Sequence, residues 1–298
     1  MRCLVTGDMG YIGSHMIRAL EEEGHEALGV DLKRGDDIID CLNYENHTSE
    51  HDIFWDFNPD YVFHMACWPR VTYSVENPVK TMRNNVLATS TVLDYSRRKG
   101  VKRVIFSSSS SVVGNDDDLG PTNPYGLQKR ISELECDLYR RLYNLETVSL
   151  RYFNVYSEDQ PADGPYTTAI ANFMDYIRKG KAPFITGDGE QRRDMIHVQD
   201  VVSANMFAMN CKKAFNMESY DVGTGDNISL NEIKLIVNKH FPDVAFEHHP
   251  ERAGEVLNTV ANTRRLSRLG WKSRIEIEQG IEFCFKKLKK EIRRNKNV

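Results

Sequence analysis

The chain has 298 residues, roughly twice the length of an average domain, so one large α/β unit or two closely packed domains are expected. Hydrophobic residues make up 40% and charged residues 28% of the chain, which excludes disordered and fibrous proteins. The net charge of −4 includes a basic tail after Phe285, so the rest of the chain is acidic and nucleic acid is not expected as a partner. We interpret the tail as the solvated end of a helix that begins near Glu276.

No export signal and no membrane span are visible in the sequence. Met1 to Val5 is a short apolar segment with no basic region before it, and no apolar run reaches about 18 residues. The six cysteines lie far apart and form no C-x-x-C pair, so we expect free thiols and no zinc site. These features predict a cytoplasmic protein with no membrane partner and no bound metal.

The N-terminal half alternates strands with helices. A strand at Cys3–Val5 leads through Gly7–Gly13 into a helix over Ser14–Glu23, and a strand follows at His25–Val30. Further strands are predicted at Tyr61–Met65, Val104–Ser108 and Thr147–Leu150, and further helices at Pro78–Lys99 and Pro124–Tyr143. This alternation predicts an α/β fold with a doubly wound parallel sheet.

The pattern changes after Tyr152, where loop-rich sequence and a turn at Gly187–Gly189 indicate a second domain. A strand at Met195–Val198, a helix to Asn210 and a strand at Phe215–Val222 could return to the sheet. We therefore predict a first domain of residues 1–153 and about 195–225. A smaller, discontinuous α/β domain would take about 154–194 and 226–298.

The segment T-G-D-M-G-Y-I-G, Thr6 to Gly13, follows a strand and precedes a helix. Glycines there let the chain turn tightly and let a pyrophosphate approach backbone N–H groups at the positive end of a helix. Asp31, at the tip of the next strand, can accept hydrogen bonds from ribose hydroxyls and would repel a 2′-phosphate. The pattern favours NAD over NADP, although Lys33 and Arg34 follow at once, and the alternative is a glycine-rich turn with a surface aspartate.

Tyr125 and Lys129 form Y-x-x-x-K and would lie one turn apart on one helix face. An ammonium beside a phenol favours the phenolate, and the positive charge of a nicotinamide would add to this effect. On its own the pair is most often a solvated surface pair. The dinucleotide motif and the serine run Ser107–Ser111 favour a general base instead, with a serine hydroxyl beside the reacting group.

Motifs along nearly the whole chain resemble the extended short-chain dehydrogenase/reductases. These motifs are T-G-x-x-G-x-x-G, H-x-A at 64–66, Asn-Asn-Val at 84–86, S-S-S-S-V-x-G at 108–114 and Y-G-x-x-K. The later segments Arg151–Tyr156, Gly187–Asp200 and Arg252–Glu255 are similar to nucleotide-sugar 4-epimerases. The resemblance implies a Rossmann domain that binds NAD, a second domain for the nucleotide sugar, and a homodimer built on the helices Pro78–Lys99 and Pro124–Tyr143.

The resemblance also implies a reaction. Tyr125 would remove the proton of the sugar 4-hydroxyl while NAD⁺ takes the hydride from carbon 4. Lys129 would hold the nicotinamide ribose and lower the tyrosine pKa, and Ser109 would hydrogen-bond the same hydroxyl. The 4-keto sugar would then rotate within the site and receive the hydride on its other face.

Further residues match binding positions of the family. The matched cofactor positions are Gly7, Gly10, Tyr11, Ile12, Gly13, Asp31, Asp40, Met65, Ala66, Asn85, Lys129, Tyr152 and Phe153. The matched substrate positions are Ser109, Ser111, Tyr125, Asn154, Arg193, Arg252 and Thr259. The small Thr259 resembles the residue that admits an N-acetyl group in related epimerases. For His197 and Asp200 we prefer a structural role.

Related dehydratases and decarboxylases usually carry an acid at the two positions held here by Ser110 and Ser111. The absence of an acid at these positions favours a 4-epimerase of a UDP-sugar. The segment Asp163–Phe173 resembles the UDP-N-acetylhexosamine and UDP-glucuronate branches of the epimerases more than the UDP-galactose branch. A dehydratase, decarboxylase or reductase, and a non-catalytic dinucleotide-sensing protein, stay as alternatives. Asp8 and Val113 depart from the family pattern, which normally has Gly and Tyr there.

Overall fold

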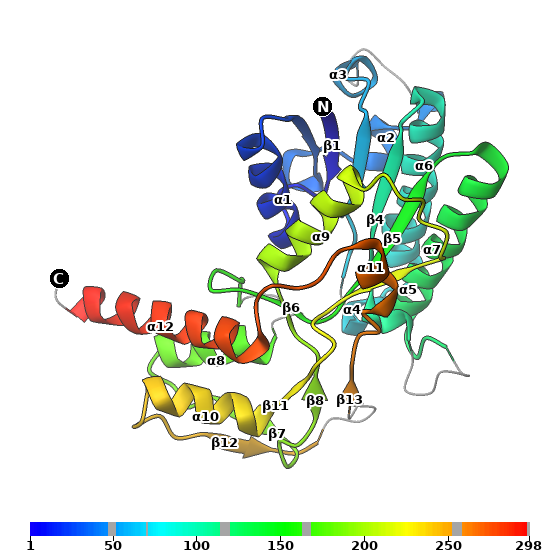
Figure 1. Ribbon diagram of the computed structural model, residues 1–298. Coiled ribbons are helices and arrows are strands. Elements are labelled where there is room, and N and C mark those ends of the chain that lie inside the picture. Colours follow the sequence, from blue (N-terminus) through cyan, green and yellow to red (C-terminus); the bar gives the residue numbers. More distant parts are fainter. Residues whose placement is uncertain (47–51, 70, 114–119, 163–167, 252–257, 297–298) are drawn as a thin grey trace.

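The computed structural model of the chain describes residues 1–46, 52–69, 71–113, 120–162, 168–251 and 258–296. Its centre is a six-stranded parallel sheet with the strand order β10-β5-β4-β3-β1-β2 (Figure 1). These strands are β1 (Arg2–Thr6), β2 (Glu26–Val30), β3 (Tyr61–His64), β4 (Arg103–Ser109), β5 (Thr147–Tyr152) and β10 (Tyr220–Val222). The sheet confirms the predicted doubly wound α/β fold. Its order reverses between β1 and β3, and such switch points hold the ligands of open α/β sheets.

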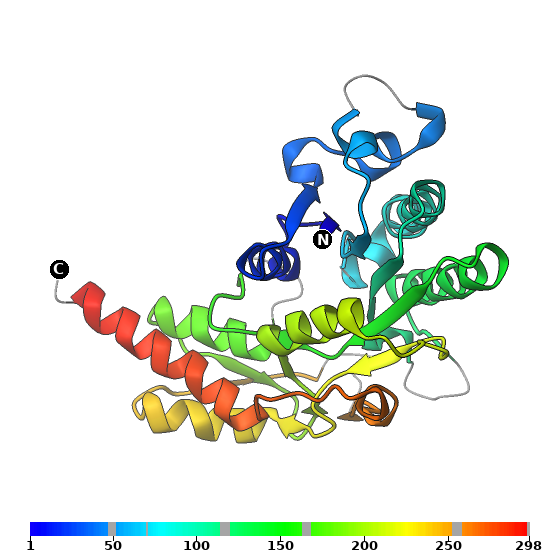
Figure 2. The same cartoon turned by 45° about the horizontal axis from the view of Figure 1, so that its top comes forward.

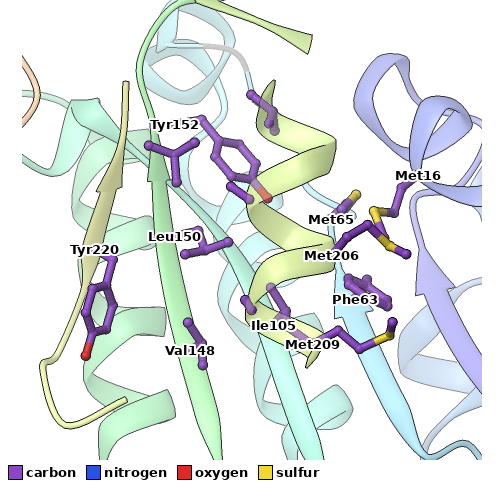
Figure 3. Packing of buried hydrophobic residues seen from close by; sticks show 14 of the residues in the cluster. Met16, Phe63, Met65, Ile105, Val148, Leu150, Tyr152, Met206, Met209 and Tyr220 are labelled. Atoms are coloured by element: carbon purple, nitrogen blue, oxygen red, sulfur yellow. The ribbon is translucent and has the colours of Figure 1, made fainter. Parts of the chain in front are cut away.

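Helices cover both faces of the sheet because its strands are apolar on both faces. Successive side chains of β1 alternate, so Val5 joins a core under α1 (Tyr11–Glu22) and α9 (Val198–Asn210). Leu4 joins a core under α2 (Ile38–Cys41), α6 (Ala88–Lys99) and α7 (Pro124–Tyr143). Figure 3 shows the first core, where Met206 of α9 lies between the sheet and α1.

A third core lies away from the sheet. It joins α8 (Ala169–Arg178), α10 (Leu230–His240) and α12 (Ile277–Lys296), which lie side by side at one end of the molecule (Figure 2). Three small sheets complete this region, with the strand orders β11-β8-β13, β12-β7 and β6-β9. Their strands are β6 (Val155–Tyr156), β7 (Phe184–Thr186), β8 (Arg192–Arg193), β9 (Ile196–His197), β11 (Ile228–Ser229), β12 (Glu247–His249) and β13 (Asn258–Thr259). We propose that this region is the second domain.

Two elements differ from the predictions. The helix predicted over Pro78–Lys99 contains a π-helical turn η4 (Arg83–Leu87) between α5 (Pro78–Met82) and α6. The strand Ile196–His197 pairs with β6 and not with the central sheet, because β10 takes the place beside β5. The remaining short helices are η1 (Leu32–Arg34), η2 (Tyr44–Asn46), α3 (Asp52–Asp56), α4 (Val71–Glu76), η5 (Ser110–Val112) and α11 (Arg264–Leu269).

The structure also places the cysteines, His197 and Asp200. All six cysteine thiols are free. His197 caps α9 and its Nε2 lies 3.1 Å from Glu158 Oε2, while Asp200 accepts hydrogen bonds from the backbone N–H groups of Arg274 and Ile275. Both residues therefore have structural roles. Among the described residues, no helix is long and apolar enough to cross a membrane.

His64 makes folding pH-dependent. Its ring is buried between Thr6 and Thr89, with Nδ1 2.7 Å from Thr6 Oγ1 and Nε2 3.0 Å from Thr89 Oγ1. Burial, together with the positive charge of Lys129, lowers its pKa to about 3. The unfolded chain binds a proton below pH ~6.5 that the folded chain rejects, so stability falls as the pH falls toward 3.

We expect the free energy of unfolding to fall by up to about 1.4 kcal/mol for each pH unit below 6.5 because of His64. Urea unfolding of wild type and His64→Gln between pH 6.5 and 5 measures this slope, which should be shallower in the variant. The exposed His248 gives the control, since His248→Gln should keep the wild-type slope. Equal slopes in all three proteins would contradict the assignment.

Candidate active site

The glycine-rich loop lies at the carboxyl end of β1, at the switch point of the sheet. Gly7 has a φ of +74°, and a Cβ atom there would lie 2.7 Å from the Cα of Ala66. A Cβ atom on Gly13 would overlap the carbonyl oxygen of Gly7. Helix α1 begins at Tyr11 with no acidic residue in its first turn, so its N-terminus favours an anion.

A cavity of about 940 Å³ extends from this loop. Its lining includes the predicted residues Gly7, Gly10, Tyr11, Ile12, Gly13, Asp31, Met65, Ala66, Ser109, Ser111, Tyr125, Lys129, Tyr152 and Asn154. Asp31 Oδ1 accepts the backbone N–H of Lys33 at 2.8 Å, and its Oδ2 accepts that of Met9 at 3.1 Å. A tight loop, a helix N-terminus and a carboxylate at the end of β2 together fit a dinucleotide such as NAD.

Three predicted cofactor residues do not line this cavity. Asp40 lies on α2 with an exposed side chain, whereas the nearby Asp37, which caps that helix, does line the cavity. Asn85 is buried, because its side chain accepts the backbone N–H of Trp68 and donates to Gln128 Oε1. The cavity is lined by its neighbour Asn84 instead.

Phe153 is the third of these residues. Its side chain is buried, while its backbone N–H donates to Val222 and its carbonyl oxygen accepts the N–H of Ile196. The backbone of Phe153 thus connects the end of β5 to β9 and β10.

The residues predicted to react meet where β4 and α7 adjoin. Helix α7 begins after Asn123, whose side chain accepts the backbone N–H of Gly126, and Pro124 stands at its first position. One turn of α7 brings Tyr125 and Lys129 to the cavity, and the Tyr125 side chain is hydrogen-bonded to Ser109. Lys129 Nζ donates to the carbonyl oxygen of Ser107 at 2.6 Å.

The serine run divides its side chains between two faces. Ser108 Oγ donates to Glu133 in the core, while Ser107 Oγ lies 2.9 Å from the hydroxyl of Tyr152. Ser109 Oγ lies 3.2 Å from Ser111 Oγ and accepts the backbone N–H of Ser111. Ser109 also shares a hydrogen bond with Tyr125.

Burial dominates the electrostatics of Tyr125. The loss of solvent raises the pKa of its phenol, the nearby Cys67 raises it further, and the hydrogen bond with Ser109 opposes both effects. Lys129 Nζ lies 6.0 Å from the centre of the Tyr125 ring. The groups that shift the pKa of Tyr125 do not include Lys129, and their net effect is to raise it.

A second cavity of about 260 Å³ adjoins the first, since Asn154 and Thr168 line both. The predicted substrate residue Arg193 lies on its wall, and Asn154 Nδ2 donates to the carbonyl oxygen of Asp194 at 2.6 Å. Arg252, the other predicted arginine, lies outside the described residues.

Thr259 does not line either cavity. It pairs with Arg193 between β13 and β8, and its carbonyl oxygen accepts the backbone N–H of Asp194. Among the described residues its hydroxyl is buried without a hydrogen-bond partner. The structure therefore gives no reason to place Thr259 at the sugar.

Several cavity residues were not predicted. In the first cavity these include Lys33, Asp36, Asp37, Ile38, Cys67, Trp68, Tyr73, Asn84, Gln160 and Thr168, and in the second Asn172, Phe173, Tyr176, Phe184 and Gln191. Trp68 and Tyr73 form a ring pair at 5.1 Å. Their nearness to the H-x-A motif is the sequence signal that could have found them.

Comparison with known proteins decides the family. Residues 3–223 match the model of the NAD dependent epimerase/dehydratase family. The chain belongs to this family. NAD is accordingly its cofactor, which agrees with the loop, the helix N-terminus and Asp31 at the first cavity.

Similar proteins act on UDP-sugars. The chain is 35% identical to a protein of Methanocaldococcus jannaschii, over 94% of this chain and 95% of that one, which is named provisionally as a UDP-glucose 4-epimerase. The UDP-glucose 4-epimerase of Thermotoga maritima with UDP-glucose has a TM-score of 0.86 at 29% identity, over 98% of this chain and all of that one. The UDP-N-acetylglucosamine 4-epimerase of Methanobrevibacter ruminantium, in complex with UDP-N-acetylmuramic acid, has a TM-score of 0.84 at 28% identity, over 96% and 97% of the two chains.

Proposed function

We propose that the protein inverts the configuration at carbon 4 of a UDP-sugar. The observation that carries this proposal is the meeting of Ser109, Tyr125 and Lys129 in a cavity with two different ends. One end carries the glycine-rich loop and Asp31, and the other continues through Asn154 into the second cavity. A sugar at Tyr125 would thus lie between the cofactor and its own nucleotide.

The chain's own residues have distinct tasks in this reaction. Tyr125 takes the proton of the 4-hydroxyl and later returns a proton to the new one. Ser109 orients the hydroxyl, and Lys129, held by Ser107, binds the ribose next to the reacting ring. NAD⁺ held by the glycine-rich loop and Asp31 would supply a reversible hydride acceptor for carbon 4, and its positive charge would favour the Tyr125 phenolate.

The lining of the cavity favours epimerisation over elimination or decarboxylation. Ser110 and Ser111 line it at the positions where related dehydratases and decarboxylases usually have an acid. Among the described lining residues the carboxylates are Asp31, Asp36 and Asp37, all after β2 at the cofactor end. We therefore assign the proton transfer at the sugar to Tyr125, which bonds Ser109, and not to a carboxylate.

The second cavity suits the nucleotide of the substrate. The guanidinium group of Arg193 matches phosphate oxygens, and the aromatic side chains of Phe173, Tyr176 and Phe184 offer flat apolar surface for a base. Similar proteins that bind UDP-sugars support uridine as this base.

Incubation with UDP-glucose, UDP-N-acetylglucosamine and UDP-glucuronate, without added NAD, tests the proposal and identifies the sugar. NMR of the anomeric and 4-position protons should show the 4-epimer of at least one substrate. A 4,6-dehydrated or decarboxylated product would favour the alternative enzymes. No reaction with any of the three would favour a dinucleotide-sensing protein.

Asp31 predicts which dinucleotide the protein carries. Because its carboxylate lines the cavity at the end of β2, it would repel a 2′-phosphate. Denaturation of the purified protein should therefore release NAD(H), identified by mass spectrometry of the supernatant. Release of mainly NADP(H) would show that Lys33 or Arg34 governs the pocket.

We also propose that the protein is a homodimer that pairs through α7 and α5. One side of α7 exposes four leucines between 42% and 63%, and α5 adds two exposed residues. These residues are Leu127, Leu134, Leu138, Leu142, Val79 and Met82. An exposed apolar surface of this kind marks an interface, and a second copy would bury it in a four-helix bundle.

Light scattering after size-exclusion chromatography tests this surface. The wild type should have the mass of a dimer. The variant Leu134→Glu/Leu138→Glu should have the mass of a monomer, because a dimer would bury the new carboxylates without partners. Leu235→Glu changes an exposed leucine on α10, outside this surface, and should stay dimeric. A monomeric wild type, or a dimeric double variant, would refute the proposed interface.

A further inference from the structure

Asp8, which departs from the family pattern, does not line the cofactor cavity. Its carboxylate instead pairs with Arg34, with Oδ1 2.7 Å from Nη2, and its side chain is only 10% exposed. Gly29 makes room for this pair, because a Cβ atom there would overlap the Asp8 carboxylate and lie 2.7 Å from Arg34 Nη2. The end of β2 is thus built around the Asp8–Arg34 contact.

Asp36 also pairs with the guanidinium group of Arg34. Arg34 Nε donates to Asp36 Oδ2 at 3.2 Å, so two carboxylates share one cation. Lys33, the other cation of this turn, donates from Nζ to the carbonyl oxygen of Met9 at 2.7 Å. Lys33 lines the cavity, whereas Arg34 does not.

A 2′-phosphate beside Asp31 would need a cation to balance it. Arginine is well suited, because its guanidinium pairs phosphate oxygens bidentately. Arg34 follows Asp31 closely in sequence, but two of its nitrogens, Nη2 and Nε, are directed to Asp8 and Asp36. We infer that Asp8 and Asp36 hold Arg34 away from a 2′-phosphate and so strengthen the selection of NAD over NADP, with Asp8 as a further specificity-determining residue beside Asp31.

The inference rests on NAD as the cofactor and not on the identity of the sugar. Binding of NAD⁺ and NADP⁺ to the full chain freed of nucleotide, measured by calorimetry, tests it without sugar turnover. Failure of the epimerase assay and failure of this inference are therefore distinguishable.

We expect Asp31→Asn/Asp8→Asn to bind NADP⁺ at least tenfold tighter than Asp31→Asn alone, about the gain of one charge-assisted hydrogen bond. Adding Arg34→Ala should abolish this gain, because the released guanidinium is its source. Asp60→Asn is the control, because it removes an equal negative charge from an ion pair with Lys102, away from Arg34. Added to Asp31→Asn, it should leave the affinity for NADP⁺ unchanged.

Equal NADP⁺ affinity with and without Asp8→Asn, or a gain that survives Arg34→Ala, would overturn the inference. Thermal unfolding shows whether each variant is folded. If the Asp8 variant fails to fold, Asp36→Asn releases Arg34 from the other of its two carboxylates. It should then raise NADP⁺ affinity only while Arg34 is present, and an unchanged affinity would equally overturn the inference.

Discussion

Tyr125→Phe should lower kcat by about 10²–10⁴-fold, because the reaction loses the group that takes and returns the hydroxyl proton. The fold should persist, since among the described residues the phenol bonds Ser109 at the edge of a cavity and the ring stays in place. Bound NAD should also persist, because the glycine-rich loop and Asp31 are unchanged.

Tyr139→Phe is the matched control on the same helix. Tyr139 is half-buried on α7 and does not line either cavity, so loss of its hydroxyl should leave kcat near the wild-type value. Initial rates of both variants with the substrate found in the panel, together with their NAD content, measure the effect. Near-normal turnover by Tyr125→Phe would exclude this residue as the base.

Glu133→Ala should destabilise the fold by about 3–5 kcal/mol, the cost of leaving a buried charge without its partner. Glu133 is fully buried on α7, where both of its oxygens accept hydrogen bonds from Arg151 at 2.7 Å. The same carboxylate accepts from Ser108 Oγ at 2.6 Å. The pair therefore joins α7, β4 and β5 directly beneath the reacting residues.

Urea unfolding measures this loss. Glu282→Ala breaks solvent-exposed pairs with Lys286 and Lys239 and should leave stability almost unchanged. Glu133→Ala/Arg151→Met removes both charges of this pair and should recover part of the lost stability. A single Glu133→Ala variant no less stable than Glu282→Ala would contradict the importance of the buried pair.

Local sequence was sufficient where the site depends on one element. The glycine spacing predicted the loop before α1, and Y-x-x-x-K predicted two side chains on one face of α7. The bounds of α7 agree with Pro124–Tyr143 because Asn123 and Pro124 mark its start. In each case the signal lies within one or two turns of the residues that it places.

Local sequence did not predict which of two nearby residues lines the cavity, because packing decides this. The π-helical turn alters the helical phase, so Asn84 lines the cavity and Asn85 enters the core. The short helix α2 uses Asp37 as its cap, and this places Asp37 at the cavity instead of Asp40. A regular helical period cannot reveal either choice.

Non-local pairing explains the remaining differences. Thr259 was assigned by its resemblance to related epimerases, but the strand pair of β13 with β8 sets its position. The second cavity combines α8, β7, β8 and the start of α10, which are far apart in sequence. Its aromatic residues became visible as a group only in the folded chain.

Transfer of hydrogen at carbon 4 tests the central claim most directly. The substrate identified in the panel is prepared with deuterium at carbon 4 and incubated with the protein in ordinary water. Our account predicts a 4-epimer that keeps the deuterium at carbon 4, because the hydride leaves and returns within one active site while Tyr125 exchanges only the hydroxyl proton. An epimer that has lost its deuterium to water, or no epimer at all, would contradict the account.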